Sequence, residues 1–383
     1  MGFLSIKSVK NRLYDYYFRH YLNNNLNDEN LRNKQVVVYL PGGVENKYQL
    51  DQWIEPFKAL NERTPLIVVT RDKRLFMRLK KQEVFPVYFL RELGDLISFY
   101  RRFDFPVILY LNNACPNFQS LIYSEGYHLH LNHGESEKES MHSNQSKAYD
   151  AVFCAGDRAV QRYEEALLNF DPSKYIKIGR PQLDFIRPYR LEKEPYQKVI
   201  LYAPTWEGHT ESMDYCSVDK YGTELIETLL QDPSYLVLYK PHPNMGARRS
   251  DVKKAHEKII ELIDRSSNGR YIPKEDINSV FTVVDFAFFD NSSVMIDYLH
   301  ADKPGFFFEI KKDNKMRFLS QCFTAINNMK IERLINIMKE NIEKDPNRGK
   351  RKEIKTFYLG DYDHMESTNR FINTIKDFIN SRT

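Results

Sequence analysis

The sequence predicts an α/β protein in which two Rossmann-like halves face each other across a cleft, followed by helices at the carboxyl end. The chain has 383 residues, which is too long for one ordinary hydrophobic core. Its apolar runs are continuous, as in parallel strands that helices cover on both faces. A charged, proline-containing segment at 187–198 separates two series of strand and helix patterns and indicates a linker.

The first half, 35–187, alternates apolar runs with amphipathic segments, as expected for a doubly wound parallel sheet. Its predicted strands are 35–40, 65–70, 85–90, 106–111, 127–133 and 148–156, and its predicted helices are 48–63, 72–82 and 91–103.

The second half, 188–350, repeats this alternation, and the segment 351–383 has a helical pattern. The predicted strands of the second half are 199–205, 235–243, 285–290 and 305–310, and its predicted helices are 221–231, 251–265 and 293–301.

Composition excludes several classes of protein. A formal charge of +4 is small for this length and argues against general nucleic-acid binding. The four cysteines have no CxxC spacing and no HExxH pattern occurs, so we expect reduced thiols and no metal site. No apolar run reaches the roughly 20 residues of a membrane span, so we expect a cytoplasmic protein.

The amino-terminal segment, 1–34, begins with a basic and aromatic amphipathic pattern over 1–22. Such a helix can lie on an anionic membrane surface, which would place the protein on the cytoplasmic face of the cell membrane. The alternative is a helix that packs on its own domain.

Ligands of parallel α/β sheets bind beyond the carboxyl ends of the strands, so the residues there are candidates for chemistry. The strand 127–133 ends in His133 and Gly134, with Lys138 soon after. His133 can act as a general base or simply bond within its loop, and Gly134 permits close approach of a ligand. Thr205 follows a proline at the end of the predicted strand 199–205, where its hydroxyl can face a ligand or cap a turn.

Two further strand ends suggest a phosphate site. Lys240 and His242 alternate with prolines in "KPHP", a rigid arrangement suited to a phosphoryl group or an ordinary charged turn. "DNSSVMID" places Ser292 and Ser293 where a helix begins, so their hydroxyl and N–H groups can bind an anion. Asp297 lies one turn further along and can bond a ligand hydroxyl or face solvent.

Other nucleotide chemistries lack their sequence signatures. The chain contains no Walker A pattern and no GxGxxG, and no predicted strand ends in a DxD pair; its DxD triplet, Asp361-Tyr362-Asp363, lies in the helical segment 351–383. P-loop hydrolysis, hydride transfer and metal-dependent glycosyl transfer of the single-domain type are therefore not expected.

The motifs "LNHGESEK", "IGRPQLD", "LYAPTWEG", "YKPHPN" and "DNSSVMIDYLHADKPGFFF" occur in this order between residues 131 and 308. The ordered set resembles the CDP-glycerol glycerophosphotransferase family of teichoic-acid and capsule assembly, the TagB/TagF type, and the resemblance covers roughly 35–310. The resemblance implies a GT-B fold and transfer of an alditol phosphate from a CDP-alditol, most simply CDP-glycerol, to a polymer or lipid-linked saccharide, with release of CMP. No cofactor or metal is implied.

The resemblance also implies roles for individual residues. His133 would be the base and His242 would contact the donor phosphates and stabilise the leaving CMP. Ser292 and Ser293 would hold the pyrophosphate. The residues that would line or charge the same pocket are Thr205, Asp297, Lys240, Gly134 and Lys138.

This chain has Trp206-Glu207 after "APT", "DNSS" for the usual "DYSS" and "HGES" for an "HGTP"-like form, so the donor stays open. The alternative function is a GT-B glycosyltransferase that uses a nucleotide sugar. A nucleotide-sugar 2-epimerase and a non-catalytic scaffold of a capsule-assembly complex are further alternatives.

Overall fold

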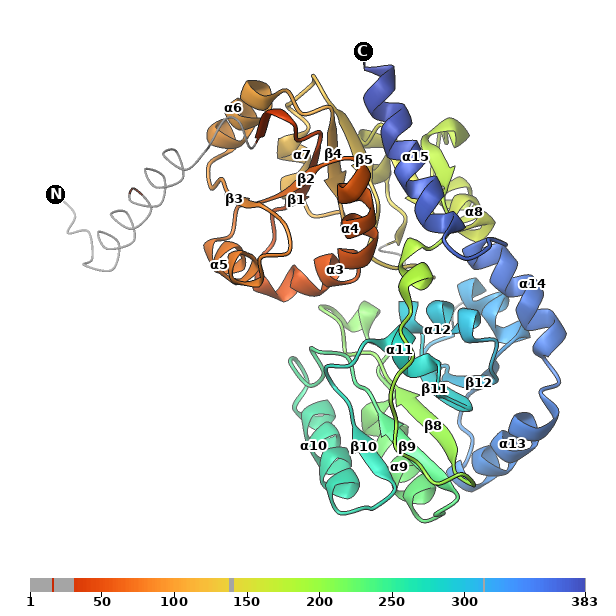
Figure 1. The fold of residues 1–383 in the computed structure, drawn as a ribbon. Coiled ribbons are helices and arrows are strands. Elements are labelled where there is room, and N and C mark those ends of the chain that lie inside the picture. Colours follow the sequence, from red (N-terminus) through yellow and green to blue (C-terminus); the bar gives the residue numbers. More distant parts are fainter. Residues whose placement is uncertain (1–15, 17–30, 138–140, 313, 383) are drawn as a thin grey trace.

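A computed structural model of the chain describes Tyr16 and residues 31–137, 141–312 and 314–382. It contains two parallel sheets, each with helices on both faces, in two domains that lie against each other (Figure 1). The prediction of an α/β protein with two Rossmann-like halves is confirmed. The predicted helix at 1–22 lies, apart from Tyr16, outside the described residues.

The first sheet has seven parallel strands in the order β3-β2-β1-β4-β5-β6-β7. Its strands are β1 (Val36–Leu40), β2 (Leu66–Thr70), β3 (Val87–Phe89), β4 (Val107–Tyr110), β5 (Tyr127–His130), β6 (Ala151–Cys154) and β7 (Tyr175–Lys177). Its helices are α3 (Lys47–Asp51), α4 (Ile54–Arg63), α5 (Lys73–Gln82), α6 (Leu93–Phe103), α7 (Pro116–Ser120) and α8 (Asp157–Ala166).

The second sheet has six parallel strands in the order β10-β9-β8-β11-β12-β13. Its strands are β8 (Lys198–Ala203), β9 (Tyr235–Tyr239), β10 (Gly269–Tyr271), β11 (Phe286–Asp290), β12 (Gly305–Phe308) and β13 (Thr324–Ile326). The helices that follow in the chain are α9 (Thr223–Leu230), α10 (Ser250–Asp264), α11 (Ile277–Phe281), α12 (Ser293–Asp297), α13 (Ile331–Lys344), α14 (Arg348–Leu359) and α15 (Glu366–Ser381).

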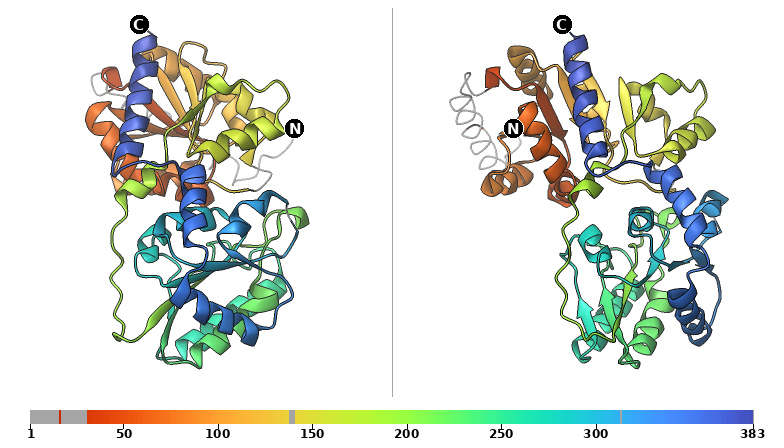
Figure 2. Two further views of the ribbon diagram at one scale, coloured as in Figure 1. Left: turned by 90° about the vertical axis from the view of Figure 1, so that its right-hand side faces the viewer. Right: turned by 45° about the vertical axis from the view of Figure 1, so that its right-hand side comes forward.

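The last helix, α15, returns to the first domain (Figures 1 and 2). Phe371, Ile372 and Ile375 are buried in the same apolar cluster as β1, β4 and the helix α4. The hydroxyl of Thr368 donates to the carboxylate of Asp184 at 2.6 Å and fastens the start of α15 to the loop after β7. The chain therefore crosses between the domains twice, once before β8 and once before α15.

The differences from the predicted elements concern short segments. The predicted helix 48–63 is two helices, α3 and α4, interrupted at Gln52 and Trp53. Three strands that we did not predict, β7, β10 and β13, have three residues each and include polar residues or glycine, so no continuous apolar run marks them. The predicted helix 293–301 continues beyond α12 only as a 3-10 turn.

In both sheets the strand order reverses direction beside the first strand, between β1 and β4 and between β8 and β11. Parallel α/β sheets bind ligands beyond the carboxyl ends of their strands at this point. The loops that follow β5 and β11 meet at the domain boundary, as the next section shows, so the fold places one ligand-binding edge of each domain opposite the other.

Candidate active site

The loops after β5 and β11 bring predicted site residues of both domains into contact. A Cβ atom placed on Gly134 would lie 3.3 Å from the Cβ of Ser293, which is a tight contact. Gly134 has no side chain, and this allows the two loops to approach so closely. The loop that carries His133 therefore lies against the turn that carries Ser292 and Ser293, and we call the place where they meet the crevice, although 159 positions separate Gly134 from Ser293 in the sequence.

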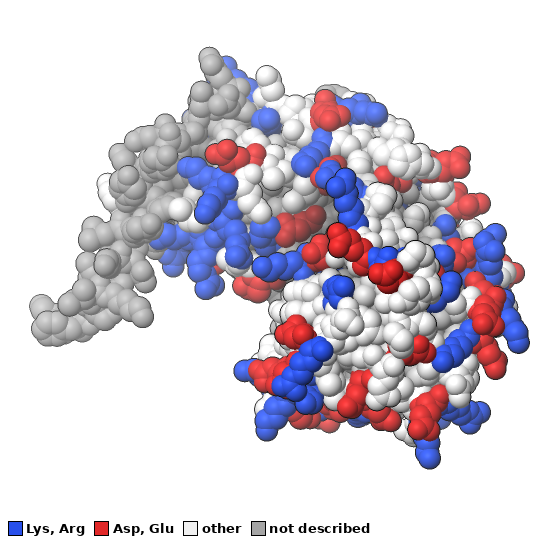
Figure 3. Space-filling model, turned by 60° about the horizontal axis from the view of Figure 1, so that its bottom comes forward, with Lys and Arg blue, Asp and Glu red and all other residues white. Residues whose placement is uncertain are grey.

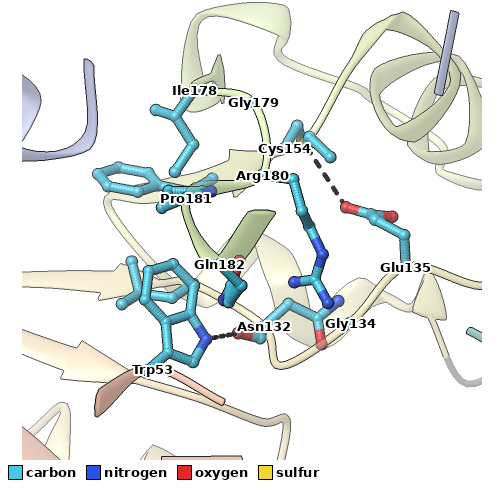
Figure 4. Close-up of a pocket in the computed structure, with 13 residues that line it drawn as sticks. Trp53, Asn132, Gly134, Glu135, Cys154, Ile178, Gly179, Arg180, Pro181 and Gln182 are labelled. Atoms are coloured by element: carbon cyan, nitrogen blue, oxygen red, sulfur yellow. Dashed lines mark hydrogen bonds between the residues drawn. The ribbon is translucent and has the colours of Figure 1, made fainter. Parts of the chain in front are cut away.

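A sharp turn presents His133 at the end of β5. Asn132 has a φ of +63°, a left-handed conformation that asparagine tolerates better than most residues. Its carbonyl accepts a hydrogen bond from the indole N–H of Trp53 at 2.8 Å, and its side-chain oxygen accepts one from the His133 N–H at 2.9 Å. Figure 4 shows Trp53 on one side of this turn and Arg180 on the other.

The ring of His133 is arranged to act as a base. Its Nδ1 lies 3.0 Å from the carbonyl oxygen of Leu111, which can only accept, so Nδ1 carries the proton and Nε2 keeps its lone pair. Burial lowers the pKa of His133, the hydrogen bond to Leu111 raises it, and the nearby Arg180 cation lowers it further; the net direction is downward. The ring is therefore neutral at physiological pH, as a general base requires.

His242 reaches the same region from the second domain. Its Nδ1 accepts a hydrogen bond from the backbone N–H of Asn244 at 3.1 Å, so the proton of the neutral ring is on Nε2. The ring stacks on Trp206, with 5.7 Å between ring centres. Tyr48 connects the two histidines, because its ring centre lies 5.7 Å from that of His133 and 6.5 Å from that of His242.

Polar atoms without a partner mark the start of α12. Ser292 takes the extended conformation of an N-cap residue, but its side chain makes no capping hydrogen bond. Its buried Oγ and the buried Nδ2 of Asn291 have no hydrogen-bond partner among the described residues. Buried polar groups are normally satisfied, so these two atoms indicate a place for an oxygen-rich ligand. The two serines were predicted phosphate-binding residues, whereas Asn291 was not.

Asp290, the last residue of β11, connects the start of α12 with the segment that follows β8. Its carboxylate accepts hydrogen bonds from the backbone N–H of Thr205 at 2.8 Å and of Ser217 at 3.3 Å. Thr205, two residues after the end of β8, is buried. The hydrogen bond that Asp290 accepts from the Thr205 N–H fixes the position of Thr205 relative to the turn formed by Asn291 and Ser292.

Three other predicted residues lie differently. The ammonium group of Lys240 is 3.5 Å from the carbonyl oxygen of Pro273, and burial lowers its pKa. Asp297 bonds a protein cation, Arg180. Lys138 lies outside the described residues. The crevice therefore contains His133, Gly134, Ser292 and Ser293, with Thr205 and His242 at its second-domain side.

The cation that pairs with Asp297, Arg180, was not among the predicted site residues. Its Nε and one terminal nitrogen donate to the two carboxylate oxygens at 3.0 and 3.2 Å, and both side chains are only 7% exposed. The same guanidinium lies 3.8 Å from the Cβ position of Gly134 (Figure 4). The pair joins the loop after β7 in the first domain to α12 in the second. Its sequence signal is the arginine of "IGRPQLD", whose own acidic residue, Asp184, accepts from Thr368 and is not the partner of Arg180.

Buried ion pairs hold the loop that follows Gly134. Glu135 pairs with Arg162, and Glu137 pairs with Arg158 at 2.6 Å. Arg158 and Arg162 lie on α8, so the loop is fastened to the body of the first domain. A fixed loop keeps His133 in place, which a general base needs.

Replacement of Arg158 by methionine should lower the free energy of unfolding by roughly 3–5 kcal/mol, because it leaves Glu137 charged and buried without its main partner. Denaturant unfolding of the variant measures the loss. Lys350→Met, which breaks an exposed pair with Glu353, is the control and should cost less than about 1 kcal/mol. Equal losses in the two variants would contradict this role of Glu137.

Among the described residues, no group of three or more histidine, cysteine or acidic side chains could hold a metal ion. No described helix is both long and apolar enough to cross a membrane.

Comparison with known proteins identifies the family. Residues 123–376 match the family model described as CDP-glycerol:poly(glycerophosphate) glycerophosphotransferase. The chain belongs to this family. The matched region contains His133, His242 and the Ser292–Ser293 pair, and it extends through most of α15.

Curated relatives are polymerases of teichoic acid. A teichoic acid poly(ribitol-phosphate) polymerase of Bacillus spizizenii is 26% identical over 190 residues, which is 46% of this chain and 29% of the relative. The ribitol-phosphate polymerase TarK of Staphylococcus aureus is 25% identical over 112 residues, 29% of this chain and 20% of the relative. The chain thus matches less than a third of the length of these relatives.

Solved structures confirm the fold. The wall teichoic acid polymerase TagF, in a structure with CDPG, has a TM-score of 0.61 at 14% identity, with 99% of this chain and 97% of that chain covered. An epimerase of Listeria monocytogenes, described as a UDP-N-acetylglucosamine 2-epimerase, has a TM-score of 0.63 at 12% identity and covers 91% of this chain and 97% of its own. The predicted GT-B architecture is therefore confirmed.

Proposed function

We propose that this family member transfers an alditol phosphate, most simply glycerol phosphate, from a CDP-alditol to a hydroxyl group of a cell-surface polymer or lipid-linked saccharide. The observation that carries the proposal is the contact between the His133–Gly134 loop and the Ser292–Ser293 turn. This contact supports a reaction in which a base from one domain, His133, acts beside a phosphate bound by the other domain. The relatives named as ribitol-phosphate and wall teichoic acid polymerases support the substrate class.

In this proposal Nε2 of His133 takes the proton of the acceptor hydroxyl. The acceptor oxygen then attacks the β-phosphorus of the donor, a new P–O bond forms, and the bond from that phosphorus to the bridging oxygen of CMP breaks. The Nε2–H group of His242 donates to the donor phosphates and stabilises the negative charge that accumulates on the leaving CMP. CMP and the lengthened acceptor are the products.

The diphosphate would be held at the start of α12. The unpartnered Nδ2 of Asn291 and Oγ of Ser292, together with Ser293, offer donors to its oxygens. Thr205 would line the same pocket. Lys240 and Lys138 would add positive charge, and Asp297 would act through Arg180, which it orients between the two loops.

The released nucleotide tests the proposal. The purified chain is incubated with an acceptor and, separately, with CDP-glycerol, CDP-ribitol and a set of nucleotide sugars, and the products are separated by ion-exchange chromatography. Release of CMP with a CDP-alditol supports the proposal. Release of UDP or GDP from a nucleotide sugar, with no CMP from any CDP-alditol, would contradict the proposal and support the alternative function, a nucleotide-sugar glycosyltransferase.

The pH dependence should report His133. We expect kcat/KM to fall as the pH drops through the lowered pKa of His133, because the protonated ring cannot accept a proton. The groups that face this ring are Arg180, His130, Tyr48 and the Leu111 carbonyl. Arg180→Met removes a cation that disfavours the imidazolium form, so the acidic limb should move to higher pH. An unmoved limb, or movement to lower pH, would contradict the assignment of the base.

We also propose that the protein acts at the cytoplasmic face of the membrane through 1–22. Deletion of 1–22 should reduce co-sedimentation with phosphatidylglycerol vesicles, since the segment is basic and aromatic. Vesicles of phosphatidylcholine are the control, because they lack the net negative charge. Unchanged sedimentation with anionic vesicles would show that the segment packs on its own domain.

A further inference from the structure

A second cleft opens beside the two histidines, at the edge of the first domain. It has a volume of about 510 Å³ and is lined by residues of both domains, among them Tyr48, Arg78, Gln82, His242 and Asn244. A volume of this size is typical of ligand sites. Because Tyr48 contacts the rings of both His133 and His242, the cleft is continuous with the proposed reaction centre.

The helix α5 forms the outer wall of this cleft and is strongly basic. Five of its ten residues are lysine or arginine, and none is acidic. Leu75, Phe76 and Leu79 are buried against the domain, so the opposite face points outward. Figure 3 shows Lys and Arg side chains gathered at the edge of the first domain, near the hollow between the domains.

The cations that share the outer face of α5 are Arg74, Arg78 and Lys81, spaced by one helical turn each. All three are exposed, and none has a hydrogen bond or ion pair to a described residue. The helix dipole favours a cation such as Lys81 in the last turn, but it does not account for Arg74 and Arg78, which lie further forward. The three span roughly 10 Å at 1.5 Å per residue.

The cleft is lined by two acidic and two basic side chains, so the excess positive charge belongs to the outer face of α5. Asp51 pairs with Lys47 at 2.5 Å, which leaves Glu45 as the other carboxylate of the lining. Arg78 therefore offers an unpaired guanidinium, with five donors in a planar fork, at the mouth of a cleft that leads to His242. Such a fork binds phosphate oxygens in pairs.

We infer that α5 and this cleft bind the acceptor, as a chain linked by phosphodiesters. Its terminal hydroxyl lies at His133 and its preceding phosphates lie on Arg78, Arg74 and Lys81. This rests on the proposed function, in which each transfer adds one such phosphate to the acceptor. The concave lining favours a flexible chain over a flat membrane surface, since Arg78 and Gln82 face a hollow shared with the second domain.

Binding without any donor tests this inference. The full chain is titrated into a short fluorescent oligo(glycerol phosphate), and anisotropy is recorded over a series of salt concentrations. Arg78→Glu should weaken binding by about tenfold, and Arg74→Glu/Arg78→Glu should weaken it further and reduce the salt dependence. The matched control is Arg265→Glu, which reverses an exposed arginine at the far end of α10 and should leave binding unchanged.

The outcomes separate this inference from the proposed function. Unchanged oligomer binding in the Arg78 and Arg74 variants overturns the inference, even if CMP is released from a CDP-alditol. Weakened binding supports it, even if no CDP-alditol proves to be a donor. Phosphatidylglycerol vesicles provide a second arm: loss of vesicle binding with unchanged oligomer binding would show that α5 contacts the membrane and would also overturn the inference.

Discussion

Replacement of His133 by asparagine is expected to lower the transfer rate by about 10²- to 10⁴-fold, the usual contribution of a general base. The amide of asparagine can still donate to the Leu111 carbonyl, as Nδ1 of His133 does at 3.0 Å, so the turn after β5 keeps its shape. The amide has no basic lone pair where Nε2 was. The loss should therefore appear in kcat, measured as CMP release with saturating CDP-glycerol and acceptor.

Two further measurements show that the effect concerns proton transfer. CDP-glycerol should bind the His133→Asn variant with nearly unchanged affinity, measured by calorimetry, because the proposed site of the donor phosphates is on the second domain. His364→Asn, which changes an exposed histidine ahead of α15, should retain full activity. Full turnover in His133→Asn would remove His133 from the mechanism.

Loss of His242 should lower kcat by about 10²- to 10³-fold, as expected when one preorganised donor to a developing negative charge is removed. Two substitutions separate its possible contributions. His242→Phe keeps a ring that can stack on Trp206 but has no N–H, whereas His242→Gln has an N–H near the position of Nε2 and no ring. We expect the glutamine variant to be clearly more active than the phenylalanine variant.

The opposite order would show that stacking on Trp206 is the main contribution of His242. Donor affinity gives an independent check, because weaker CDP-glycerol binding is expected in both variants. Equal activity of His242→Phe and the unchanged protein would contradict a role for His242 in stabilising the leaving CMP.

The sequence predicted the sheets well because buried parallel strands are long apolar runs. Each of the ten strands predicted from such runs overlaps one strand of the structure, and the predictions 127–133, 148–156 and 235–243 extend beyond β5, β6 and β9 into the adjoining loops. A three-residue strand outside an apolar run, such as β10, leaves no such record. Gln52 and Trp53 carry no helix-breaking signal themselves, but Pro56 has no N–H to donate to the carbonyl of Gln52 and fits only the first turn of a helix, so a new helix, α4, begins shortly before it.

Residues of the site were predictable where they follow a strand directly. His133, Gly134, Ser292 and Ser293 have this position, and the structure brings them together. Arg180 could not be assigned, because its importance arises from Asp297, which lies 117 positions away in the other domain. Tyr48 in α3 and Trp206 in the loop after β8 are similar: aromatic residues are common at such places, and only the rings that they contact show their relation to the site.

The most direct test of the central claim is a crystal structure of the His133→Asn variant with CDP-glycerol. The account predicts that the diphosphate lies at the start of α12, within hydrogen-bond distance of Asn291 and Ser292, with its β-phosphorus facing position 133 and His242 beside the bridging oxygen. A nucleotide bound with its phosphates away from this crevice, and with Asn291 and Ser292 still unpartnered, would contradict the account.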